Sequence, residues 1–308
     1  METQQPREQI NTSSMKATCL ALLDTMADDE IQHLRQDISK TGYVSEMVVA
    51  RIFGGAGWQV YDHLYFLDKE ENKGREIDLT AIYASTKKNP KKSLTVKVGL
   101  SVEVKKAASK PWVVFTSPLN PPLETIENLF DTSLIRLHIQ EIWFPTLYEN
   151  HPISKCKGFG RVSYQSFRGQ QEGDNTVPKR GLSRSSITPN FAAFVLSFKA
   201  AFEIRDFFRL GNNQPLRDAN NVRSYEVGIV HGLIVVDGKL YDAAVQDNGS
   251  FDITDVAHIP YVFSYNSKEY GARRLLIDIV TVNHLARYLQ IYEAWIKKRA
   301  VYCLNELS

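Results

Sequence analysis

Apolar and polar positions along the chain follow two periods, and the changes between them mark the expected elements. Apolar residues recur every three or four positions over 15–39 and 44–53, which predicts two successive helices. Alternating or short apolar runs then predict strands over 61–66, 76–83, 94–104 and 112–115. Helices followed by a meander of strands favour a mixed α/β fold of the α+β type.

The second half of the chain also shows both periods, after a segment of different composition. Segment 151–190 has five glycines and seven basic residues, which predicts a long basic loop or an insertion. Helices are expected over 191–211 and 282–300. Strands are expected over 229–236, 240–245, 261–265 and 275–280, with Asp237-Gly238 as a hairpin turn between the first two. No linker is evident, so we expect a flexible tail over 1–14 and a single elaborated domain over 15–308.

Composition and charge narrow the classes of protein that this chain resembles. Its 308 residues carry 37 basic and 35 acidic side chains, so any affinity for nucleic acid must come from local clustering. The three cysteines are far apart in the sequence, which argues against a disulfide framework and for a reducing compartment. No apolar run is long enough to span a bilayer, so we expect a cytoplasmic protein without a membrane partner.

Two of the expected strands carry polar residues in a regular alternation with aliphatic ones. Asp78 stands between Ile77 and Leu79 in the segment Gly-Arg-Glu-Ile-Asp-Leu. Glu103 and Lys105 alternate with Val102 and Val104 in the segment Val-Glu-Val-Lys-Lys, so the two polar side chains are expected on one face. Two carboxylates and an amine on one rigid surface are typical of a divalent-metal site beside a water-activating group.

The acidic-x-Lys pattern by itself has little weight, since it occurs three times. Glu71-x-Lys73 lies in a charged loop and Asp237-x-Lys239 in the expected hairpin turn. Only Glu103-x-Lys105 lies within an apolar strand that follows another acidic strand.

In this arrangement the chain resembles the PD-(D/E)XK nuclease superfamily, over residues 40–116. Asp78 matches the first acid of that family, Glu103 the second and Lys105 the lysine, while Glu46 matches an acid that many members carry in the preceding helix. Ile77 stands where the namesake proline would be, a departure that many members share. The resemblance implies a restriction-endonuclease-like fold, a central mixed sheet flanked by helices, here with an elaborated second half.

The resemblance also implies a metal-dependent nuclease, with an endonuclease favoured over an exonuclease. Asp78, Glu103 and Glu46, with the backbone carbonyl of Val104, would be the ligands of Mg²⁺, for which Mn²⁺ would substitute. Lys105 would orient or deprotonate the attacking water. DNA is favoured over RNA as the substrate. Restriction or antiphage defence, as a homodimer or as the effector subunit of a larger complex, is the expected setting.

Basic residues near the motif are candidates for phosphate contact. Lys106 and Lys110 are closest in sequence to the proposed site. The lysines within 87–92 flank Asn89-Pro90, and a solvated turn is favoured there over a DNA clamp.

Three other interpretations stay open at the level of sequence. The acids and the lysine are also typical of the solvent face of an antiparallel sheet, where glutamate and lysine are common neighbours. A nuclease-like fold can serve as a catalytically silent nucleic-acid-binding or assembly module. A metal-dependent enzyme acting on small phosphorylated molecules would use the same residue types.

Overall fold

The computed structural model describes residues 30–117, 159–165, 189–210, 223–246 and 248–306. Contacts divide the chain into two units, Met1–Val44 and Ser45–Ser308. In the first unit, residues 30–40 form a helix whose Ile31, Leu34 and Ile38 are exposed. The expected tail over 1–14 lies outside the described residues, and so does most of 151–190.

The second unit is of mixed α and β structure, as expected, and its sheet contains both parallel and antiparallel pairs. Its helices are α2 (Tyr43–Gly55), α4 (Pro189–Leu210) and α5 (Val282–Glu306). Its strands are β1 (Gln59–Asp68), β2 (Lys73–Lys88), β3 (Lys92–Ser117), β4 (Phe159–Gln165), β5 (Arg223–Val245), β6 (Phe251–Asp255), β7 (His258–Ser267) and β8 (Gly271–Thr281). The strand order is β1-β2-β3-β4-β7-β8-β5-β6, and β3 also pairs with β5. Strand β4 lies inside the segment expected to be a basic loop.

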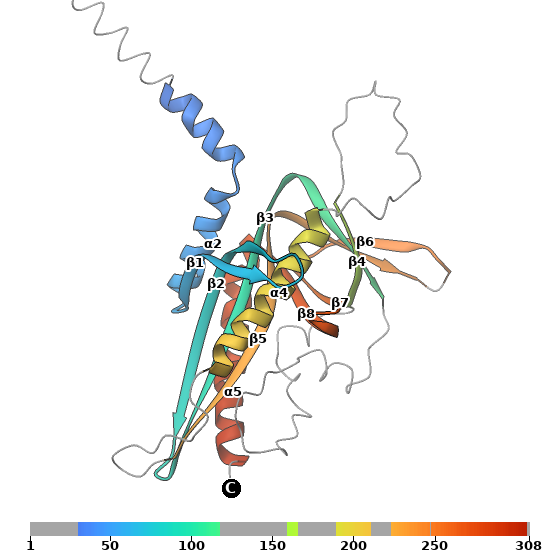
Figure 1. Ribbon diagram of the computed structural model, residues 1–308. Coiled ribbons are helices and arrows are strands. Elements are labelled where there is room, and N and C mark those ends of the chain that lie inside the picture. The colour runs from blue at the N-terminus through green and yellow to red at the C-terminus, as the bar shows by residue number, and fades with distance from the viewer. Residues whose placement is uncertain (1–29, 118–158, 166–188, 211–222, 247, 307–308) are drawn as a thin grey trace, which may run out of the picture. The chain divides into compact units, whose positions relative to one another are not determined.

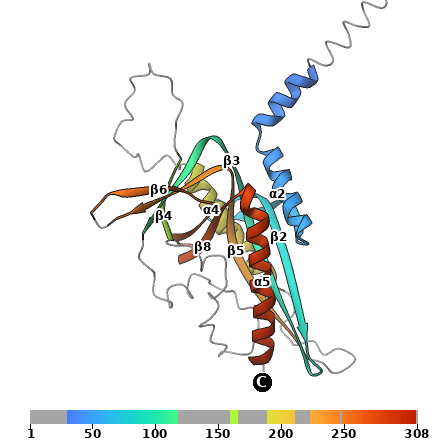
Figure 2. The same cartoon turned by 180° about the vertical axis from the view of Figure 1, so that it is seen from behind.

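Helices cover both faces of this sheet. On one face, α2 and α5 pack Val49, Phe53 and Tyr292 against aliphatic residues of β2, β3 and β5. On the other face, α4 packs Phe194 and Phe198 against strands that include β5, β7 and β8. The two views agree, with α4 in front of the sheet in Figure 1 and α5 in front of it in Figure 2. Most of the sheet therefore has apolar residues on both faces. For this reason the alternation of apolar and polar residues is weak in its central strands.

The long strands β3 and β5 differ from the sequence-based expectation. The expected strands 94–104 and 112–115 are parts of β3, which continues through a register shift between Ala107 and Trp112. Asp237-Gly238 is not a hairpin turn, because β5 runs straight through it in parallel with β3. Gly238 has a φ of 155°, and a Cβ there would lie 2.6 Å from the carbonyl oxygen of Ala107. The glycine is needed for the close approach of two strands and not for a turn.

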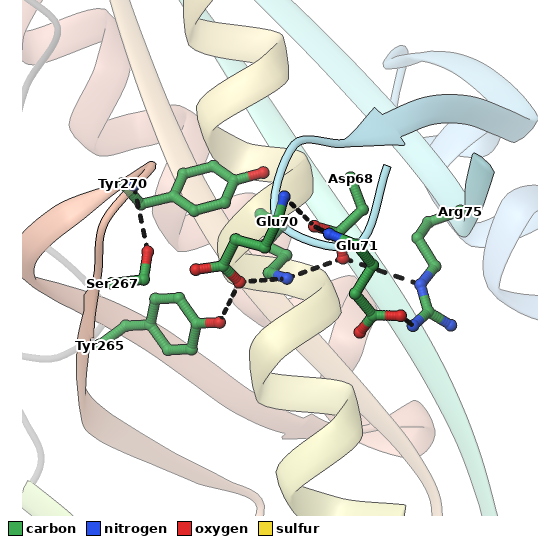
Figure 3. Close-up of polar contacts among 8 residues, drawn as sticks. Asp68, Glu70, Glu71, Arg75, Tyr265, Ser267 and Tyr270 are labelled. Carbon is green, nitrogen blue, oxygen red and sulfur yellow. Dashed lines mark hydrogen bonds and ion pairs between the residues drawn. The ribbon is translucent and has the colours of Figure 1, made fainter. Parts of the chain in front are cut away.

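A buried lysine fixes the turn between β1 and β2 to helix α4. The Lys199 side chain is 2% exposed, and its Nζ lies 2.7 Å from Asp68 Oδ2 and 2.6 Å from Glu70 Oε2. Tyr265 donates a hydrogen bond of 2.5 Å to the same Glu70 oxygen. Figure 3 shows these carboxylates converging beside α4. Since β2 begins just after this turn, the cluster anchors the strand that carries Asp78.

None of the described helices is long and apolar enough to cross a membrane.

Candidate functional site

The residues singled out by the sequence meet where β2 separates from β3. The two strands pair from Lys88↔Ser93 as far as Leu79↔Val102, and the continued register places Asp78 opposite Glu103. Instead of a further ladder bond, the backbone N–H of Val104 donates to Asp78 Oδ2 at 2.7 Å. N–H and C=O of one residue point to the same edge of a strand, so the Val104 carbonyl faces this opening as well.

Burial differs strongly among the three motif side chains. Glu103 is 1% exposed, whereas Asp78 is 22% and Lys105 30% exposed. Lys105 Nζ lies 2.6 Å from Glu103 Oε2 and 3.8 Å from Asp78 Oδ2, so the amine bridges the two acids. Oxygen Oε1 of Glu103 is buried and has no hydrogen-bond partner among the described residues. A buried carboxylate oxygen without a hydrogen-bond partner costs free energy, so this oxygen remains available to a ligand.

The electrostatics of the cluster follow from this geometry. Burial raises the pKa of Glu103 to about 7; Lys105 opposes the rise, while Asp78 adds to it. Burial acts to lower the pKa of Lys105, but the charges of Glu103 and Asp78 outweigh it and raise that pKa above 10.5. Near neutral pH the site therefore holds a cationic amine and an acid that can gain or lose a proton.

Glu46 joins the same cluster from helix α2. It lies in the first turn of the helix, and burial raises its pKa, followed by the charge of Asp78. Ser45, the residue before it, donates a 2.5 Å hydrogen bond to Asp237 on β5, which fixes this end of the helix against the sheet. The sequence-based grouping of Glu46 with the three motif residues therefore agrees with their positions.

Two residues of the cluster were not predicted from the sequence. The Nδ1 atom of His63 on β1 contacts Oε1 of Glu76, and both side chains lie close enough to influence the pKa of Glu46. The β1–β2 ladder skips His63 and Asp78, which would face each other, and His63 has a φ of 52°. A left-handed histidine within a strand is strained, and such strain is concentrated at functional sites. Only the pairing register of β1 with β2 places this histidine beside Asp78.

The break at His63 also changes the environment of the residues around Asp78. Ile77 packs with Phe66 and with Ala200 of α4, whereas Leu79 belongs to the core on the other face. Strict alternation would place Ile77 and Leu79 on one face opposite Asp78, but the two residues pack in different core clusters. On β3 the expectation is confirmed, because Val102 and Val104 are both buried in the core shared with α5.

The remaining candidates lie near the cluster or outside it. Lys106 is exposed and stands opposite Asp237 in the β3–β5 register. Lys110 lies in the irregular part of β3, and its side chain is outside the described residues. His231 is buried with Tyr292 and Asp278, and Asp278 also accepts hydrogen bonds from His258 and Tyr288. That histidine belongs to a polar network of the core.

The fit of a metal ion to this site is partial. Among the described residues, no group of three or more His, Cys, Asp or Glu side chains is arranged to hold one. The site nevertheless offers hard oxygen donors, namely Asp78, the Val104 carbonyl and the unpartnered Oε1 of Glu103. Oxygen donors of this kind suit Mg²⁺, which keeps several of its own waters and needs few protein ligands.

Comparison with known proteins gives no match to a family model, a curated protein or a solved structure.

Proposed function

We propose that this protein is a metal-dependent nuclease with a restriction-endonuclease-like fold, acting on DNA. The observation that supports this most directly is the meeting of Asp78, Glu103 and Lys105 where β2 separates from β3. A solvent-facing pair of surface residues would not explain a glutamate that is 1% exposed with one unpartnered oxygen. Burying a carboxylate costs several kcal/mol unless it has a compensating role or partner.

Each residue would have a distinct task in phosphodiester hydrolysis. Asp78, Glu103 and the Val104 carbonyl would hold the ion, and Glu46 would complete its ligands or position a water. Bound Mg²⁺, or Mn²⁺ in its place, supplies charge neutralisation on the phosphate and a water of lowered pKa. Lys105, already cationic between the two acids, would orient the attacking water and stabilise negative charge on the phosphate oxygens.

The test is cleavage of single-stranded and double-stranded DNA and RNA with Mg²⁺ or Mn²⁺. Wild type is expected to cut DNA, and Asp78→Asn and Lys105→Ala are each expected to lose about 10²-fold or more in rate. Lys268→Ala is the control, since Lys268 is exposed in the turn between β7 and β8. Calorimetry should show Mn²⁺ binding to wild type that is weakened in Asp78→Asn. Wild type that cuts no nucleic acid, or variants that cut at the wild-type rate, would refute the proposal.

One observation favours a second candidate, a catalytically silent nucleic-acid-binding or assembly module. Lys105 Nζ lies 2.6 Å from Glu103, so this acid has a cationic partner of its own. A module of this kind would bind nucleic acid or a partner protein and bind no Mn²⁺. Turnover of nucleotides without cleavage of polymers would point instead to a small phosphorylated substrate.

A further inference from the structure

The end of the β2–β3 hairpin far from the proposed site carries a dense group of cations. We call these residues the basic tip: Lys87, Lys88, Lys91, Lys92 and Arg223. Strand β5 brings Arg223 into the group, because it runs parallel to β3 with Arg223 opposite Lys92. The three strands can be followed together to this end in Figure 1. The fifth cation comes from a distant part of the sequence, so the hairpin sequence alone underestimates the charge.

The backbone of the basic tip is held by hydrogen bonds. The side chain of Asn89 accepts the backbone N–H of Lys91 at 3.0 Å and that of Lys92 at 2.8 Å. The N–H of Arg223 donates to the carbonyl of Lys91 at 3.1 Å, and the hydroxyls of Ser93 and Ser224 are 3.0 Å apart. The cations are therefore presented on a fixed frame, and little ordering of the backbone would be needed for binding.

Along the described part of β5, the acid nearest to Arg223 is paired with a lysine outside the tip. Glu226 is the acid closest to Arg223 on β5, and its Oε1 lies 2.8 Å from Lys97 Nζ, farther along β3. Lys88, Lys91 and Arg223 are exposed. Like charges this close repel one another, so an approaching polyanion would relieve the repulsion and release its own counterions.

The distance from the tip to the proposed site matches the geometry of a nucleic-acid duplex. Lys88 lies ten positions beyond Asp78 on the same strand, which is about 33 Å at about 3.3 Å per residue. About ten base pairs of B-form duplex span the same length, at about 3.4 Å per pair.

A single strand fits the tip less well. Binding of single strands relies on exposed aromatic platforms on which bases stack. The aromatic residues nearest the tip serve the core instead, since Tyr83 packs on Trp58 and Tyr225 packs against the same cluster. The tip thus offers charge without stacking, which suits a phosphate backbone whose bases are already paired.

We propose that the basic tip binds the phosphate backbone of a nucleic-acid duplex about one helical turn from the site of Asp78 and Glu103. This inference rests on the proposed function for the identity of the site, but its test does not need cleavage. The ligand class is double-stranded, and sequence is not read at the tip, because phosphate contacts carry no sequence information.

The experiment measures binding of fluorescent probes by anisotropy in EDTA, so that no metal-dependent cleavage occurs. The probes are duplexes of about 8 and 24 base pairs, of which only the longer spans the 33 Å implied by strand geometry, and a 24-nucleotide single strand. Lys88→Ala/Lys91→Ala is compared with Lys268→Ala/Lys298→Ala, which removes the same charge from exposed positions elsewhere. Melting curves of both double variants check that the fold is kept.

Wild type and the control are expected to bind the long duplex equally, and tighter than the short one. The tip variant should lose roughly tenfold to hundredfold in affinity for the long duplex at ~0.1 M salt, and its salt slope should fall by about 1.8. Equal affinity and slope for wild type and the tip variant would overturn the proposal. So would absence of duplex binding, or a single strand bound as tightly as the duplex. If the tip variant loses affinity for the duplex as expected but wild type cuts no nucleic acid in the presence of metal, duplex binding by the basic tip is supported and the nuclease proposal fails.

Discussion

Neutralising Glu103 is expected to stabilise the metal-free protein above neutral pH. Burial raises the pKa of this carboxyl from 4.5 to about 7, so the folded protein keeps a proton that the unfolded chain releases. The stability that this proton provides is fully present below pH 4.5 and is lost as pH rises through about 7. At about 1.4 kcal/mol per pH unit, the loss amounts to about 3 kcal/mol. The side chain is 1% exposed, so solvent screens little of this cost.

Glu103→Gln keeps the volume of the side chain and stays neutral at every pH. At pH 8 in EDTA its free energy of unfolding should exceed that of wild type by about 3 kcal/mol, or roughly 5 °C in melting temperature. Near pH 5 the difference should fall to about 0.7 kcal/mol, because only half a pH unit separates pH 5 from the ordinary pKa of the carboxyl. Urea denaturation between pH 5 and pH 8 measures the difference. Glu269→Gln, at an exposed position between β7 and β8, should stay within about 0.5 kcal/mol of wild type throughout.

Two results would refute this reasoning. A Glu103→Gln variant no more stable than wild type at pH 8 would mean that the ion pair with Lys105 compensates fully for burial of the charge. A stability difference that does not change with pH would mean that Glu103 does not titrate in this range. Saturating Mn²⁺ should narrow the gap at pH 8, because only the ionised carboxylate would bind it.

Two further predictions concern the frame around the site. Lys199→Met should lower the free energy of unfolding by about 3–5 kcal/mol in urea denaturation, because it leaves Asp68 and Glu70 without their buried cation. Lys268→Met is the exposed control. A loss under about 1 kcal/mol would show that the remaining partners suffice, namely Arg75, whose Nε lies 3.8 Å from Asp68 Oδ2, and Tyr265. Gly238→Ala should cost about 1–3 kcal/mol, because a Cβ there would lie 2.6 Å from the Ala107 carbonyl oxygen. Gly54→Ala in helix α2, where an added Cβ would have nothing within 4 Å, should instead raise the free energy of unfolding by about 0.5–1 kcal/mol. Thermal melts measure both variants. Equal effects of the two alanines would contradict the close approach of β3 and β5.

Local sequence patterns were enough to predict the motif strands and the grouping of their polar residues. Alternation of Glu103 and Lys105 with Val102 and Val104 is a property of a few neighbouring residues, and the structure has the same alternation. Helix α2 was also expected, from the helical spacing of Val44, Val48 and Ile52. Its buried face is instead formed by Ser45, Val49 and Phe53, while Val44 and Val48 are exposed. These features need no information from distant parts of the chain.

Features that depend on distant partners were missed. Asp237-Gly238 has the composition of a turn, but pairing with β3 over more than a hundred intervening residues keeps β5 extended. Segments 94–104 and 112–115 were expected as separate strands, whereas both belong to β3. Pro111 lies in the irregular stretch between them, where a proline is tolerated. His63 gave no local signal, since its left-handed backbone and its place beside Asp78 depend on the β1–β2 register.

The pairing of β3 with β5 also bears on when the site can form. Ser93 and Ser224 are hydrogen-bonded across 131 positions of sequence, and the strand that carries Glu103 lies between β2 and β5. Contacts of such long range form slowly, because a large loop must close first. On a ribosome, β3 would wait for more than a hundred further residues before β5 emerged. Acid and lysine would therefore reach their final positions only when most of the chain had been synthesised, and a chain truncated before β5 would lack the strand that supports them.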